Sequence, residues 1–83
     1  MFSEYIEAAL KRAKYETLRN GTYMATVDGL QGVIATGETI EACRVDLIEV
    51  IEEWITIRLQ RDLGIPALDG CVIRVSQELM AVV

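Results

Sequence analysis

Along this chain, the spacing of apolar residues is first typical of a helix, then of strands, and then of a second helix. In residues 3–14 they recur three and four positions apart, and Ser3 can cap the N-terminal end, so we expect a short amphipathic helix. Glutamates in its first half and basic residues in its last turn suit the helix dipole. Its expected apolar edge consists of Phe2, Ile6, Ala9, Leu10 and Ala13.

Three short strands are predicted next. Asn20-Gly21 is a hairpin signal because both residues tolerate positive φ, and Gly29 and Gly32 mark a second turn. The residues on either side of these turns favour extended structure. We therefore expect an antiparallel three-stranded meander, with strands at residues 15–18, 22–27 and 33–37.

A long helix is expected after the strands, over residues 39–63. Thr39 is the expected N-cap, and Gly64 and Pro66 are expected to end the helix. Its apolar residues cover an arc of roughly 200°, whereas a one-sided surface helix needs roughly 100°. One face therefore covers the sheet, and the excess predicts contact with the N-terminal helix, a second copy of the chain or a partner. The residues expected on this oligomer or helix-packing surface are Ile48, Ile55, Ile57 and Leu59.

The polar face of this long helix is acidic. Glu49, Glu52 and Glu53 lie on it, either as a solvated face or as a strip that binds a basic partner. Trp54 is expected in the core, where it anchors the helix on the sheet. Beyond a turn at residues 69–70, a fourth strand is predicted over residues 71–75. The predicted fold class is α+β.

Composition limits the function. The 83 residues fit a single domain, 52% of them are apolar, and the net charge is −5. So small a domain cannot bury all of its apolar surface, so we expect a homo-oligomer, a dimer or a tetramer. Its negative charge disfavours nucleic acid, and we expect no direct binding of it. Without a membrane-spanning run or a signal peptide, we expect a cytoplasmic protein that does not contact a membrane.

Catalytic chemistry has few candidates in this chain. It contains no histidine, which excludes nucleophile–histidine catalysis and histidine-based zinc sites. Cys43 and Cys71 lie in different elements and are expected to be reduced thiols. The glycines are dispersed at turns and form no nucleotide-binding motif. We therefore expect a binding protein without enzymatic activity, cofactor or metal.

An ordered series of motifs runs along the middle of the chain: Tyr23–Val27, the turn at residues 29–33, residues 35–37, the helix start at residues 39–43, and residues 49–54. This series resembles the HicB-like antitoxin family. This resemblance implies a degenerate RNase-H-like β-β-β-α-β domain that binds and covers a small HicA-like, mRNA-cleaving toxin. The turn at residues 28–32 lacks the prolines of the family pattern, and the helix at residues 3–14 is an addition to it.

Family members often carry a C-terminal DNA-binding domain. This chain ends at Val83 without room for one, so we expect no direct operator binding. Two alternatives stay open: an orphan domain that serves as an oligomerisation module, and a residual metal-dependent nuclease. The nuclease would use Asp28, Glu38 and Asp46, because metal-assisted hydrolysis needs converging carboxylates.

Overall fold

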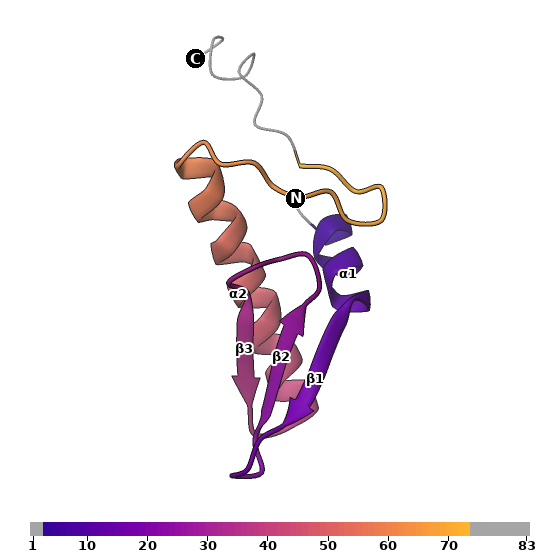
Figure 1. The fold of residues 1–83 in the computed structure, drawn as a ribbon, viewed down its shortest axis with the longest axis vertical. Coiled ribbons are helices and arrows are strands. Elements are labelled where there is room, and N and C mark those ends of the chain that lie inside the picture. Colours follow the sequence, from indigo (N-terminus) through magenta and orange to yellow (C-terminus); the bar gives the residue numbers. More distant parts are fainter. Residues whose placement is uncertain (1–2, 74–83) are drawn as a thin grey trace.

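A computed structural model of the chain describes residues 3–73 (Figure 1). Three antiparallel strands form one sheet in the order β1-β2-β3, and a long helix lies along one face of it. A short helix precedes the sheet and contacts the long helix. The α+β fold class is therefore confirmed. The elements are α1 (Ser3–Lys11), β1 (Ala13–Thr17), β2 (Tyr23–Val27), β3 (Ile34–Gly37) and α2 (Ile40–Gln60).

The core lies between the sheet and α2. The strand register places Tyr15, Ala25 and Ala35 side by side across the sheet, and both alanines are buried. Small residues on this face let α2 approach the sheet closely. At Gly37 this approach leaves no room for a side chain, since an added Cβ would lie 2.4 Å from the backbone nitrogen of Cys43. Only glycine fits at that position without a shift of α2.

Both ends of α2 have defined caps. The Thr39 side chain accepts a hydrogen bond from the Ala42 N–H, which confirms the predicted N-cap. The helix ends at Gln60 and not at residue 63, because Asp62 takes the left-handed conformation (φ 58°). Its N–H donates to the Leu59 carbonyl and the Leu63 N–H to the Arg58 carbonyl, the two bonds of a Schellman motif. Gly64 lies beyond this motif, so the expectation that it ends the helix is wrong.

The first helix is shorter than expected. It ends at Lys11 and not at residue 14, because Ala13 and Lys14 already pair with β2. Its buried side chains are Tyr5, Ala8 and Ala9, while Ile6 and Leu10 are half-buried. The helix is thus rotated relative to the expected apolar edge.

The strands begin and end within a few residues of the expected bounds, and the first turn differs in type. The Gly21 N–H donates to the Leu18 carbonyl, and the Leu18 N–H to the Thr22 carbonyl. These bonds enclose a three-residue loop with only Gly21 at positive φ (84°), where a two-residue turn with two such residues was expected. A three-residue loop of this kind places one left-handed residue after an ordinary turn.

The segment after α2 crosses to α1 (Figure 1). Leu68 is buried, and the Tyr5 hydroxyl donates to the Pro66 carbonyl. Asp69 and Gly70 both have positive φ and form the expected turn, closed by two hydrogen bonds between Leu68 and Cys71. No strand forms over residues 71–73, where Cys71 makes only an isolated bridge, and residues 74–75 of the predicted fourth strand lie outside the described residues.

Candidate partner-binding surface

The 21-residue helix α2 carries the candidate surfaces for binding a partner. Residues four positions apart form ridges along a helix. Four such ridges can be defined on α2, and each has a different environment. They are the core ridge (Cys43, Leu47, Ile51, Ile55), the edge ridge (Asp46, Val50, Trp54, Arg58), the outer ridge (Val45, Glu49, Glu53, Ile57) and the groove ridge (Ile40, Arg44, Ile48, Glu52).

The core ridge fixes the helix on the sheet. All four of its side chains are fully buried, and half-buried Leu59 continues it by one turn. The Cys43 thiol lies 3.6 Å from the Ala35 carbonyl, within reach of a weak hydrogen bond. Burial raises the pKa of this thiol, and the nearby Asp46 carboxylate raises the pKa further. A neutral, inert thiol is expected from such surroundings.

Side chains of the edge ridge form hydrogen bonds with backbone groups at the border of the sheet. The Thr36 N–H donates to Asp46 Oδ2 over 3.1 Å, and the Trp54 indole N–H donates to the Gln31 carbonyl over 3.2 Å. The Arg58 guanidinium lies over the Trp54 ring, 5.0 Å from its centroid, and its Nε donates to the Gly64 carbonyl. Trp54 is half-buried, so it packs at the edge of the core and not inside it as expected.

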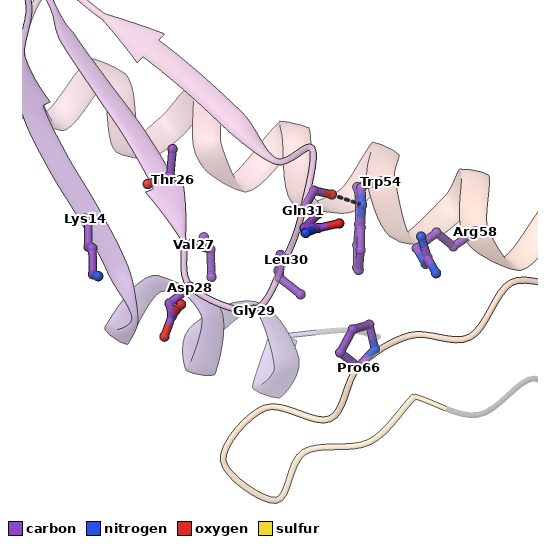
Figure 2. A pocket seen from close by; sticks show the side chains of 10 residues that line it. All are labelled: Lys14, Thr26, Val27, Asp28, Gly29, Leu30, Gln31, Trp54, Arg58 and Pro66. Carbon is purple, nitrogen blue, oxygen red and sulfur yellow. Dashed lines mark hydrogen bonds between the residues drawn. The ribbon is translucent and has the colours of Figure 1, made fainter.

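A hollow of about 620 Å³ opens beside this ridge, between the β2–β3 turn and the segment after α2. Figure 2 shows Lys14 and Asp28 toward one end of it and Trp54 and Arg58 toward the other, with Leu30 between them. Charged groups at both ends and an apolar centre suit a protein side chain or a short peptide. Pro66 closes part of the rim.

The outer ridge is exposed along its whole length. Glu49 and Glu53 occupy its centre, Val45 is 53% exposed before them, and Ile57 is 46% exposed after them. It is therefore an acidic strip with an apolar residue at each end. Its neighbour Glu52 is exposed as well, so the structure places all three glutamates of the predicted partner strip on the solvent side of α2.

The groove ridge faces a second hollow, of about 570 Å³, between α1 and α2. Half-buried Ile6 and Leu10 of α1 and Ile48 of α2 provide its apolar residues. Exposed polar side chains complete the lining: Ser3, Glu7, Arg44 and Glu52. Ile48 and Glu52, which were predicted for different roles, thus lie in one groove.

The predicted packing residues divide among these surfaces. Ile48 lines the groove and Ile57 lies on the outer ridge, so both are available to another chain. Ile55 is fully buried in the chain's own core, which leaves only internal packing to it. Leu59 is half-buried against the same core.

The carboxylates of the nuclease alternative have separate surroundings. Asp28 is exposed beside the hollow of Figure 2, Glu38 is exposed before α2, and Asp46 accepts a hydrogen bond from β3. Within residues 3–73, no three Asp, Glu, Cys or His side chains group to hold a metal ion. Within those residues, too, no helix is long and apolar enough to cross a membrane.

The sequence did not lead us to predict the burial of Tyr5 or the stacking of Arg58 on Trp54. Burial raises the pKa of the Tyr5 phenol, while the charge of Arg58 acts in the opposite direction. The spacing of Tyr5, Ala8 and Ala9 is helical and could have revealed the true buried face of α1. The Arg58–Trp54 pair is also at helical spacing, i and i+4.

Comparison with known proteins gives a family and a fold. A family model described as UPF0150-like matches residues 4–66, which is more than half of the chain. The crystal structure of TTHA0281 from Thermus thermophilus is similar, with a TM-score of 0.83 and 30% sequence identity. The similarity covers 90% of this chain and 94% of that chain. No curated protein matches the sequence.

Proposed function

We propose, from the premise that the chain belongs to the UPF0150-like family, that it is an antitoxin of the HicB type. Such an antitoxin neutralises a small basic toxin of the HicA type by protein contact. The observation that carries this proposal is the outer ridge of α2. Two adjacent turns present Glu49 and Glu53 to solvent, between the exposed apolar side chains of Val45 and Ile57. A basic protein surface with apolar positions around its cations complements this arrangement.

The mechanism follows from what an mRNA-cleaving toxin must expose. Such a toxin needs cationic side chains to bind the phosphate backbone of its substrate. Glutamates on a rigid helix can form ion pairs with those cationic side chains, and the apolar residues at the ends of the outer ridge can exclude water around the pairs. The core ridge supplies the rigidity, because its four buried side chains fix the orientation of α2. Inhibition then requires no chemistry from the antitoxin itself.

Localisation in the cytoplasm belongs to the same proposal. An antitoxin acts where its toxin meets mRNA, and two free cysteines, Cys43 and Cys71, suit a reducing compartment.

The test begins with the neighbouring reading frame, which should encode a small basic protein with a single catalytic histidine. Co-expression with this chain should restore growth and yield a complex that co-purifies. We expect Glu49→Lys/Glu53→Lys to weaken the complex at least tenfold in calorimetry and to lower its association rate, since charge pairs steer encounter.

A matched control is Glu4→Lys/Glu16→Lys, which makes the same change of charge at exposed positions on α1 and β1. It should leave affinity within about threefold at moderate salt, where distant charges are screened. Equal losses for both double variants would show that only net charge matters and would remove the outer ridge from the proposal. Absence of any complex with the wild-type chain would remove the antitoxin role itself.

A further inference from the structure

The groove ridge of α2 carries charges that no side chain within residues 3–73 pairs. In the part of the chain that the structure describes, the only salt bridge joins Arg12 and Asp69. Arg44 and Glu52 thus flank the apolar Ile48 on the same ridge, both exposed, with no ion-pair partner in residues 3–73. Charges of opposite sign on either side of an apolar centre form a pattern that can pair with its own inverted copy.

The spacing of Arg44, Ile48 and Glu52 along α2 allows this pairing with an inverted copy. Arg44 and Glu52 each lie four residues from Ile48, about 6 Å along the helix axis in opposite directions. If a second α2 crosses in the antiparallel sense with the twofold axis at Ile48, Arg44 of each chain faces Glu52 of the other. Ridges of residues four apart are the ones that most often interdigitate when helices pack.

We propose that the groove between α1 and α2 is a homodimer interface, in which two copies of α2 pack antiparallel about Ile48 with reciprocal Arg44–Glu52 ion pairs. A twofold interface must be self-complementary, and the charges of this ridge meet that condition. Ile6 and Leu10 of α1 widen the apolar centre on each side. The interface does not depend on the antitoxin role, because it uses a different ridge from Glu49 and Glu53.

A second copy fits this groove better than a partner of one charge sign. A basic partner would meet Arg44, and an acidic one would meet both Glu7 and Glu52. Two copies of this chain, each with net charge −5, repel one another at long range. Moderate salt screens this long-range repulsion more than it screens the close reciprocal pairs, so the dimer should form more readily at moderate than at very low salt.

Charge reversal tests the geometry. Arg44→Glu and Glu52→Arg should each shift sedimentation at micromolar concentration from dimer to monomer, because each places like charges across the twofold axis. The double variant R44E/E52R should form the dimer again. Equimolar mixing of the two single variants should also restore it, since one chain then carries two acidic and the other two basic side chains at these positions. Glu53→Arg, a reversal on the outer ridge, is the matched control and should remain dimeric.

A crosslink provides a second, independent readout. Ile48→Cys in a Cys71→Ser background should form an intermolecular disulfide under mild oxidation, because residue 48 lies on the proposed axis, while Glu53→Cys should not. Circular dichroism establishes that each variant is folded. A wild-type chain that is monomeric at about 100 µM would overturn the proposal. So would a dimer that survives both single reversals, or single variants that are not rescued by each other.

Discussion

Replacement of Gly37 by alanine should destabilise the domain, because the added methyl group would collide with the backbone of α2. The added Cβ would lie 2.4 Å from the Cys43 nitrogen and 2.8 Å from both the Ala42 carbonyl carbon and the Cys43 Cα. Ordinary van der Waals contacts begin at 3.4 Å, and all three atoms belong to the backbone of α2. No side chain can rotate away to make room, so the first turn of α2 must move off β3.

The expected magnitude follows from two opposing effects. Overpacking of this kind costs about 1–3 kcal/mol, and more where the backbone must shift. Alanine restricts the unfolded chain and returns about 0.4–1 kcal/mol. We expect a net loss of about 2 kcal/mol in the free energy of unfolding. For a domain of this size, that corresponds to a fall in melting temperature of roughly 8–16 °C.

Urea denaturation followed by circular dichroism measures this loss. Gly64→Ala is the matched control, because nothing lies within 4 Å of its added Cβ and its φ is not positive. The control should be neutral or slightly stabilising. A Gly37→Ala chain within about 0.5 kcal/mol of the wild type would refute the reasoning, since α2 would then have room that the structure denies it.

Three further outcomes are expected from the caps and the buried thiol. Thr39→Ala removes the acceptor of the Ala42 N–H and should cost about 1 kcal/mol of stability in urea denaturation, whereas Thr39→Ser should cost little. Asp62→Gly relieves the left-handed backbone at the end of α2 and should raise the melting temperature by a few degrees, and a decrease would contradict the Schellman cap. Burial raises the pKa of Cys43, so the folded state holds its proton longer than the unfolded state does. Stability should therefore fall as the pH rises above about 9, and Cys43→Ala should show a shallower fall between pH 8 and 10.

The two proposed interfaces divide the exposed part of α2 between them. The outer ridge offers acidic groups to a basic partner, and the groove ridge offers alternating charge to a second copy. Residues on the two ridges point in directions roughly 100° apart, as successive residues of a helix do. A dimer could therefore present two outer ridges at once, and a bivalent partner would gain from their linkage.

Local signals in the sequence determined the order and type of the elements from α1 to α2, whereas the strand predicted over residues 71–75 does not form over residues 71–73. Thr39 capped α2 as predicted because an N-cap depends only on its neighbours two or three residues away. The turn at Asp69-Gly70 formed for the same reason, since positive φ is a property of the residues themselves. The acidic strip at Glu49 and Glu53 was visible from spacing alone, because nothing else in residues 3–73 covers it.

Tertiary packing decided what those signals left open. The apolar arc of α2 could not show which side the sheet would cover, so Ile55 and Ile48 were predicted together, yet one is core and the other lines a groove. The end of α1 was set by pairing of Ala13 with Val27, a contact between residues far apart in the sequence. Trp54 was placed at the edge of the core because its indole N–H needs an acceptor, which the Gln31 carbonyl supplies. Hydrophobic spacing specifies that a face is buried, and only the three-dimensional contacts specify what buries it.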